Sequence, residues 1–357
     1  MDTAEAFEIN VIKNENSNLD KVDLDNIIFG RQFSDHMFMV DYKDGAWQTP
    51  TIRPYEHLSL SPATSAIHYG QSVFEGMKAY KNDKGEVFTF RPLDNIKRLN
   101  LSAKRMCMPE IPEKLFEEAL YKLIRLDHEW IPTAPGSALY VRPFMFATDE
   151  YIGVKPSENY RFMIFTCPVN AYYPEPVKVK IETEYSRAFE GGTGFAKAAG
   201  NYAAALYPAK LAQQQGYHQL IWTDSKEHKY IEESGTMNIM FMIDGKIYTP
   251  PVSGTILDGI TRKSVLQLAE DWGIEVIKRR VTVAEIVDAA KEGRLEEAFG
   301  TGTAATIAHI ILLSYDGQDY ELPPIESRKF SSRVGDYLDR LKRNNEEDVH
   351  GWNVQLI

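Results

Sequence analysis

The stretch Gly191-Gly192-Thr193-Gly194-Phe195-Ala196-Lys197-Ala198-Ala199-Gly200-Asn201-Tyr202 places one lysine among residues that have almost no side chain. Such small neighbours allow a flat, large group to approach the backbone. They also leave the amine of Lys197 poorly solvated, and a poorly solvated lysine is a better nucleophile. The stretch alone supports two interpretations: a lysine that forms a Schiff base with an aldehyde cofactor, or a glycine-rich surface loop.

The composition is that of an ordinary globular protein. The chain has 357 residues, which favours two domains over one core, with 43% hydrophobic and 25% charged residues. A net charge of −11 argues against a nucleic-acid partner. Cys107 and Cys167 have no metal-ligand spacing, so we expect neither a metal site nor a disulfide framework. Residues 1–21 resemble neither a signal nor a transit peptide, and no apolar run is long enough for a membrane span. We therefore expect a cytoplasmic protein.

Strand-like and helix-like segments are mixed along the chain, which predicts an α+β (mixed α/β) fold in two domains. A hairpin is expected at residues 38–47, with a turn at 43–45, and amphipathic helices at 113–129 and 203–215. Thr282 and Glu285 form a capping box that predicts a helix over 282–290. Two prolines within residues 172–178 indicate a stiff link between the domains.

Two short segments have the composition of an anion-binding turn. In the first, Gly259 precedes Ile260 and Thr261, where a helix is expected to begin with free backbone N–H groups. The alternative there is an ordinary capped helix. In the second, 300–305, small residues and hydroxyls surround two glycines. This segment either binds an anion or turns a strand into a helix.

Three charged residues stand out, each with two interpretations. Glu233 follows a strand of aromatic character and could pair with a pyridinium nitrogen, or it belongs to a solvated edge with Glu232. Arg98 lies beside Lys97 on a predicted helix, which by default indicates a solvent-facing charge. Arg142 lies in the apolar run 139–146. It either faces solvent at a sheet edge or meets a carboxylate of the substrate or the protein.

Six motifs in order resemble one family. They are His68-Tyr69-Gly70-Gln71-Ser72-Val73-Phe74-Glu75-Gly76-Met77-Lys78-Ala79-Tyr80, Phe90-Arg91-Pro92, Leu139-Tyr140-Val141-Arg142-Pro143, Lys197-Ala198-Ala199-Gly200-Asn201-Tyr202, Glu233-Ser234-Gly235-Thr236-Met237-Asn238 and Gly300-Thr301-Gly302-Thr303-Ala304. Together they resemble the branched-chain amino acid aminotransferases, which are fold-type IV (class IV) enzymes that depend on pyridoxal 5'-phosphate. The resemblance runs from about Phe29 to Ala305 and is weaker beyond.

The resemblance implies an architecture. A flexible lead-in (1–25) would precede a small N-terminal domain (26–172), an interdomain linker (173–180) and a large C-terminal cofactor-binding domain with a pseudo-barrel sheet (181–357). It also implies a homodimer whose active site is shared across the interface, with Tyr69 the expected contribution from the other subunit. Some animal members carry a Cys-x-x-Cys pair where this chain has residues 305–308 without cysteine, so no thiol switch is expected there.

The resemblance also assigns roles to individual residues. Lys197 matches the catalytic Schiff-base lysine, and Glu233 matches the carboxylate at the pyridine nitrogen. The other matches to cofactor-binding residues are Arg98, Tyr202, Thr236, Ile260, Thr261 and Thr303. The matches to substrate-binding residues are Phe29, Tyr69, Phe74, Tyr140, Arg142, Tyr172, Thr303 and Ala304.

The implied reaction is reversible transamination of L-leucine, L-isoleucine and L-valine with 2-oxoglutarate. Within the same fold, a D-amino acid aminotransferase or an aminodeoxychorismate lyase would retain Lys197, Glu233 and Arg98 with a different pocket. From another class, a non-catalytic ligand-binding relative is an alternative. The presence of all the cofactor residues argues against it.

Overall fold

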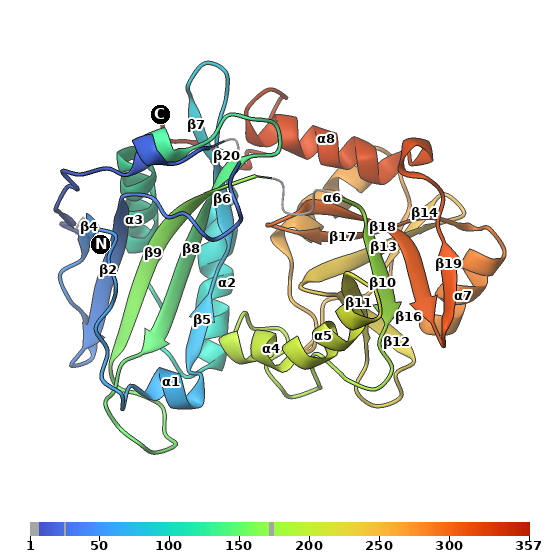
Figure 1. Ribbon diagram of the computed structural model, residues 1–357, viewed down its shortest axis with the longest axis horizontal. Helices are drawn as coiled ribbons and strands as arrows, with labels where there is room; N and C mark the ends of the chain where they lie inside the picture. Colours follow the sequence, from blue (N-terminus) through green and yellow to red (C-terminus); the bar gives the residue numbers. More distant parts are fainter. Residues whose placement is uncertain (1–6, 25, 171–174) are drawn as a thin grey trace, which may run out of the picture. The chain divides into compact units, whose positions relative to one another are not determined.

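The computed structural model describes residues 7–24, 26–170 and 175–357. The chain forms two compact units (Figure 1). The first holds residues 1–172, 196–199 and 339–357, and the second holds residues 173–195 and 200–338. Residues 339–357 therefore belong to the first unit, whereas the expected C-terminal domain, 181–357, included them. The reason is a long-range strand pairing, of β20 (Asn353–Gln355) with β7 (Val87–Phe90).

One sheet organises the first unit, with strand order β1-β4-β2-β9-β8-β6-β7-β20; β3 pairs with β2, and β5 with β8. The remaining strands are β1 (Asn10–Val11), β2 (His36–Lys43), β3 (Ala46–Trp47), β4 (Thr51–Pro54), β5 (Ser72–Phe74), β6 (Met77–Lys81), β8 (Ala138–Ala147) and β9 (Tyr160–Val169). The helices are α1 (Ser65–Tyr69), α2 (Pro92–Arg105) and α3 (Glu113–Leu126), with short 3-10 turns η1 (Leu19–Lys21) and η2 (His128–Trp130).

Local sequence explains several of these elements. The expected hairpin is confirmed as β2 and β3, because Asp44 and Gly45 adopt the positive φ angles of +52° and +76° that a two-residue turn requires. Helices α2 and α3 lie against the sheet (Figure 1) and place apolar side chains such as Leu99 and Phe116 in its core. Within the expected lead-in, β1 pairs with β4, and Ile9 is buried.

The second unit contains the remaining elements. Its strands are β10 (Val177–Ile181), β11 (Gln219–Thr223), β12 (Tyr230–Ser234), β13 (Met237–Ile243), β14 (Lys246–Thr249), β15 (Val276–Lys278), β16 (Val281–Thr282), β17 (Leu295–Gly302), β18 (Thr306–Tyr315) and β19 (Gln318–Glu321). Its helices are α5 (Leu206–Gln214), α6 (Ile260–Asp271) and α7 (Val283–Lys291), with the 3-10 turn η3 (Ile325–Ser327). Helix α4 (Ala199–Ala204) and helix α8 (Phe330–Lys342) each have residues in both units.

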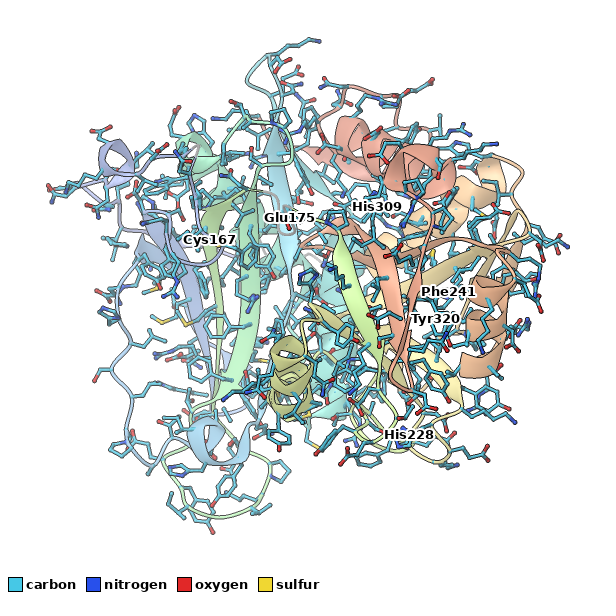
Figure 2. The ribbon with its side chains drawn as sticks, turned by 45° about the vertical axis from the view of Figure 1, so that its right-hand side comes forward. Cys167, Glu175, His228, Phe241, His309 and Tyr320 are labelled. Atoms are coloured by element: carbon cyan, nitrogen blue, oxygen red, sulfur yellow. The ribbon has the colours of Figure 1, made fainter. Side chains whose placement is uncertain are left out.

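The sheet of the second unit closes on itself. In the described part of the chain, the pairings run β13-β17-β18-β10-β11-β12, and β12 pairs again with β13. This closed ring confirms the expected pseudo-barrel in a mixed α/β fold. Aliphatic and aromatic side chains fill the core of this unit. Phe241 is fully buried among them and Tyr320 packs against them (Figure 2).

Helix boundaries follow from the local chemistry. The capping box at the start of α7 is confirmed, since the hydroxyl of Thr282 accepts a hydrogen bond from the N–H of Glu285 at 3.1 Å. The helix expected over 203–215 instead begins at Ala199 and is divided into α4 and α5. The segment after β17 leads into strand β18 and not into a helix, because residues 302 and 306 pair across a tight turn.

Candidate active site

The backbone of Lys197 is fixed on both sides. Its N–H donates to the hydroxyl of Ser102 on α2 at 2.9 Å, and its carbonyl accepts from the N–H of Phe74, the last residue of β5, at 3.1 Å. The side chain is half-buried, and its Nζ lies 4.8 Å from the centre of the Phe74 ring. Lys197 is therefore a half-buried lysine whose main chain is anchored by two elements of the first unit.

Arg98 is buried, so the interpretation as a solvent-facing charge is wrong. Its Nε and Nη2 donate to the two oxygens of Glu75, at 2.7 and 2.9 Å. Glu75 has no exposed surface and also accepts from Asn95 at 2.8 Å. Burial alone would raise the pKa of Glu75, but the charge and hydrogen bonds of Arg98, the charge of Lys197 and the hydrogen bond from Asn95 together outweigh it, and the pKa is lowered. The pair therefore remains ionised and holds the guanidinium in place.

Four predicted substrate residues lie together in the first unit. Arg142 donates to the hydroxyl of Tyr140 at 3.0 Å and lies over the ring of Phe74, 4.6 Å from its centre. Phe29 meets Tyr140 edge to face, with ring centres 5.1 Å apart. The hydroxyl of Tyr140 comes so close to Gly76 that a Cβ there would lie 2.2 Å from it, so Gly76 has to be glycine.

Of the other predicted substrate residues, Tyr69 is not part of this group. Tyr69 ends α1, is 41% exposed, and has a ring contact with His68. Tyr172 lies outside the described residues.

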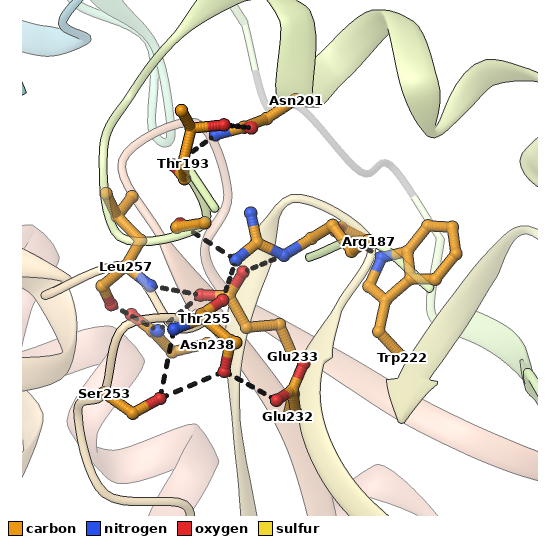
Figure 3. A network of polar contacts seen from close by, with 12 residues as sticks. Arg187, Thr193, Asn201, Trp222, Glu232, Glu233, Asn238, Ser253, Thr255 and Leu257 are labelled. Atoms are coloured by element: carbon orange, nitrogen blue, oxygen red, sulfur yellow. Dashed lines mark hydrogen bonds and ion pairs between the residues drawn. The ribbon is translucent and has the colours of Figure 1, made fainter. Parts of the chain in front are cut away.

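Glu233 is the centre of a polar network in the second unit (Figure 3). It is 3% exposed, and its Oε2 lies 2.7 Å from Nε of Arg187. Its Oε1 accepts from Nδ2 of Asn238 at 3.0 Å and from the N–H of Leu257 at 3.1 Å. One guanidinium and two N–H donors therefore stabilise the ionised form of this buried carboxylate, so the solvated-edge interpretation is wrong.

Glycines allow this network to pack closely. A Cβ on Gly259 would lie 1.8 Å from Oδ1 of Asn238, and a Cβ on Gly194 would lie 2.8 Å from the Cα and the carbonyl oxygen of Thr255. Around Gly194 the chain is clamped by two bonds between Thr193 and Asn201, at 2.7 and 2.8 Å (Figure 3). Part of the glycine content of the opening stretch therefore serves packing against residues 253–257.

The predicted anion-binding residues occupy two places in the second unit. Ile260 and Thr261 are the first residues of α6, whose N-cap Gly259 makes no side-chain capping bond. The start of this helix thus presents backbone N–H groups without a capping side chain. Thr303 and Ala304 form the turn between β17 and β18.

The remaining two predicted cofactor residues also lie in the second unit. Thr236 is exposed in the turn between β12 and β13, and Tyr202 is half-buried on α4.

Sequence reasoning missed several residues that hold these side chains. Glu75, Arg187, Asn238 and Leu257 support Arg98 and Glu233. One signal was available: Glu75 and Asn238 are polar residues inside apolar runs, 73–77 and 237–243, where a buried polar group needs a partner. Leu257 acts through its backbone and has no such signal.

Comparisons with known proteins identify the family of this chain. Residues 72–312 match the family of class IV amino-transferases. The chain is 44% identical to branched-chain-amino-acid aminotransferase 2 of Bacillus subtilis (strain 168), with 94% of each chain covered. It is 39% identical to the branched-chain-amino-acid aminotransferase of Mycolicibacterium smegmatis, with 92% of each covered. The chain belongs to the class IV aminotransferase family.

Solved structures show the same fold. The crystal structure of the Escherichia coli branched-chain amino acid aminotransferase superposes with a TM-score of 0.72 at 27% identity, covering 90% of this chain and 99% of that one. The branched-chain aminotransferase of the thermophilic archaeon Thermoproteus uzoniensis, solved with norvaline, gives a TM-score of 0.73 at 25% identity, covering 90% and 100%.

Proposed function

We propose that this chain is a pyridoxal 5'-phosphate-dependent branched-chain-amino-acid aminotransferase. It transfers the amino group of L-leucine, L-isoleucine or L-valine to 2-oxoglutarate and gives the branched-chain 2-oxo acid and L-glutamate. The observation that carries this proposal is the buried carboxylate of Glu233, which pairs with Arg187 and accepts from Asn238 and the N–H of Leu257, in a member of the class IV family. Relatives that bear this name cover nearly the whole chain.

The residues present fit the chemistry of the cofactor. A phosphate needs N–H donors and a guanidinium, and the start of α6, with no capping side chain, and Arg98 are such groups. A protonated pyridine nitrogen needs an ionised acceptor, which Glu233 provides. We assign phosphate binding to Arg98, Ile260, Thr261 and Thr303, and further cofactor contacts to Tyr202 and Thr236. When bound, pyridoxal phosphate withdraws electrons from the α-carbon of the substrate.

Each residue of the chain then has a defined task. The amine of Lys197 would hold the cofactor through its aldehyde and, when free, would act as the base that moves the α-proton of the substrate. The anchored backbone of Lys197 limits the region that its amine can reach. Glu233 keeps the proton on the pyridine nitrogen. Because donor and acceptor use one site in turn, we expect ping-pong kinetics.

Substrate selection is assigned to the aromatic group in the first unit. Phe29, Phe74 and Tyr140 offer apolar ring surface to an aliphatic side chain, and Ala304 and Tyr172 are further candidates. The distal carboxylate of glutamate needs a polar partner in the same pocket. Arg142 is that partner, since its guanidinium lies among these rings with its Nε buried and without a hydrogen-bond partner.

The test is replacement of the lysine. We expect Lys197→Ala to lose turnover by at least about 10³-fold and to lose the covalently bound cofactor colour, as measured with L-leucine and 2-oxoglutarate. A variant that transaminates like the wild type would contradict the assignment. A panel of amino donors separates the alternatives: L-leucine, L-isoleucine and L-valine should react, whereas turnover of D-alanine would indicate a D-amino acid aminotransferase.

We propose a homodimer in which Tyr69 contributes to the site of the other subunit. Tyr69 is exposed, and so are the apolar side chains of Ile67, Ile152 and Val154, the last of which is 90% exposed. Two bonds join the segments that carry these residues, from Ser65 to Asp149 and from Tyr151 to Ala63. Exposed apolar side chains of this kind favour burial against a second copy. Light scattering on a sizing column tests it, and a monomer that is fully active would contradict it.

Localisation in the cytoplasm remains part of this proposal. Among the helices in the described residues, none has the length and apolar content needed to span a bilayer.

A further inference from the structure

Glu232 is a second buried carboxyl next to Glu233 on β12, and its surroundings are different. It is 8% exposed. Its Oε1 accepts a hydrogen bond of 2.6 Å from the hydroxyl of Thr255, while its Oε2 is buried without a hydrogen-bond partner. None of the roles assigned above uses this residue. A carboxyl buried at this depth with one bare oxygen is unfavourable in its charged form, so its presence calls for a reason.

Thr255 connects Glu232 to the partners of Glu233 (Figure 3). Its hydroxyl binds Glu232, and its carbonyl oxygen accepts from Nη2 of Arg187. The same Nη2 also donates to the carbonyl of Gly194 at 3.0 Å. Two residues after Thr255, the N–H of Leu257 binds Glu233. One short segment, 255–257, therefore carries two of the groups that hold the Arg187–Glu233 pair.

Burial and nearby charges both act on the pKa of Glu232. Burial raises the pKa of Glu232 above its usual value of 4.5. The hydroxyl of Thr255 and the charges of Arg187 and Arg280 lower it, while Asp224 raises it further, and the net shift is upward. A neutral carboxyl still accepts the hydroxyl of Thr255 through its carbonyl oxygen. The hydrogen bond between Glu232 and Thr255 therefore does not require Glu232 to be charged, and burial disfavours that charge.

We propose that Glu232 is a positioning residue for Glu233: it fixes Thr255, and through it the carbonyl that orients Arg187 and the N–H of Leu257 that binds Glu233. The inference rests on the proposed function, in which Glu233 holds the proton of the cofactor's pyridine nitrogen. The strength of that hold then depends on a residue that is not expected to touch the cofactor.

Two matched pairs of variants test this proposal. Glu232→Ala and Thr255→Val remove the bond, whereas Glu232→Gln and Thr255→Ser keep it. Thr249→Val is the control, because Thr249 is also a buried threonine of the second unit, and its hydroxyl binds the carbonyl of Ile239, which is none of the groups that hold Glu233 or Arg187. If Glu232→Ala fails to fold, the two Thr255 variants decide the question.

The first readout is the pH at which the visible absorbance of the bound cofactor changes. A weaker hold on the ring proton makes the ring less electron-withdrawing, so the midpoint should move to higher pH. We expect about half a pH unit or more for Glu232→Ala and Thr255→Val, with kcat reduced more than KM is raised. Glu232→Gln, Thr255→Ser and Thr249→Val should keep the wild-type midpoint.

The second readout needs no cofactor. A carboxyl whose pKa is raised by folding stabilises the protein at low pH, and this contribution is lost as the pH rises from 4.5 through the raised pKa. Glu232→Gln lacks that dependence. Its melting temperature should therefore rise relative to that of the wild-type apoprotein over this range.

The outcomes are distinct. The proposal is overturned if Glu232→Ala and Thr255→Val melt earlier, like Thr249→Val, but keep the wild-type midpoint and kinetics, because Glu232 would then be structural only. It is also overturned if Glu232→Gln shifts the midpoint as much as Glu232→Ala. If the wild-type chain binds no pyridoxal phosphate, the absorbance band is missing altogether. In that case the proposed function fails, and this inference fails with it.

Discussion

The first and the second unit each bury an arginine–carboxylate pair. In one pair the arginine is expected to bind the cofactor, and in the other the carboxylate is. In the first unit, Glu75 is fully buried and Arg98 is the member assigned to the cofactor. In the second unit, Arg187 supports and Glu233 is the member assigned to the cofactor. The supporting member differs because the ligand groups differ: a phosphate is an anion and needs a cation, whereas a pyridinium is a cation and needs an anion.

This comparison shows how a protein can hold a buried charged side chain ready to bind a charged group of a ligand. A single buried charge is strongly unfavourable. Each side chain that we propose to bind the cofactor, Arg98 or Glu233, is therefore paired with an opposite charge and hydrogen-bonded. The two carboxylates differ in the number and kind of their partners. Glu75 accepts two bonds from Arg98, one from Asn95 and one from the N–H of Gly76, while Glu233 has an ion pair with Arg187 and accepts from Asn238 and the N–H of Leu257. Removing the support should therefore have unequal effects.

The largest effect is expected in the first unit. Glu75→Gln leaves the buried Arg98 without its counter-charge, and we expect the free energy of unfolding to fall by about 3–5 kcal/mol. Chemical denaturation of the full chain measures it. The control is Asp41→Asn, which breaks the bidentate but less deeply buried pair with Arg161 in the same unit and should cost about 1 kcal/mol. If both variants lost the same free energy of unfolding, burial would not explain the importance of the Glu75–Arg98 pair.

A smaller effect is expected in the second unit. Arg187→Met removes the ion pair but leaves Glu233 with the donors Asn238 and Leu257, so the loss should be about 2 kcal/mol. Affinity for pyridoxal phosphate, measured by fluorescence titration, should fall as well. Arg187→Lys keeps the charge and should recover part of both quantities. A loss larger than that of Glu75→Gln would reverse the order of the two pairs.

The smallest effect, with the opposite sign, is expected at two buried lysines of the first unit, because burial disfavours their charged form. Lys78 on β6 and Lys342 on α8 are both buried near Asp339 and Arg343. Burial lowers the pKa of Lys342 to about 7, with a further contribution from the charge of Lys78, and lowers that of Lys78 to about 8. The charged form is thus disfavoured in the folded state. Wild-type stability should rise as the pH increases from 7 toward 10.5, the ordinary lysine value.

Lys342→Met tests this directly. It should raise the free energy of unfolding by about 1 kcal/mol at pH 6.5, where Lys342 must carry its proton, and the gain should shrink toward pH 9. Thermal melts across that range measure the difference. The exposed Lys97→Met in the same unit is the control and should show no such trend. A gain that grows with pH would contradict the assigned direction.

Much of the architecture could be predicted because its signals are local. The turn at Asp44 and Gly45 and the capping box of Thr282 act within a few residues, and both are confirmed. At 303–305 the composition alone allows either a helix or another connection. The run 306–315 is rich in β-branched residues, and that feature favours the strand that follows the turn.

The burial of Arg98 could not be predicted from spacing, because its partner Glu75 lies 23 residues away on another element. Because Arg98 is next to Lys97 on an amphipathic helix, its sequence pattern is that of a surface residue. Only the family resemblance indicated otherwise. The support of Glu233 is similar. Leu257 contributes a backbone N–H, which any residue has, so its role follows from the path of the chain alone.

The pairing of β20 with β7 has a consequence for the order in which the protein is made. Strand β7 lies beside β6 early in the chain, and in the described residues its other edge pairs with residues 353–355 of β20. On the ribosome, the first unit therefore keeps an open sheet edge until the whole second unit has been synthesised. Leu356, which fills part of the first unit's core, arrives at the same late moment. The nascent chain should consequently depend on chaperone protection longer than its N-terminal sheet alone would suggest.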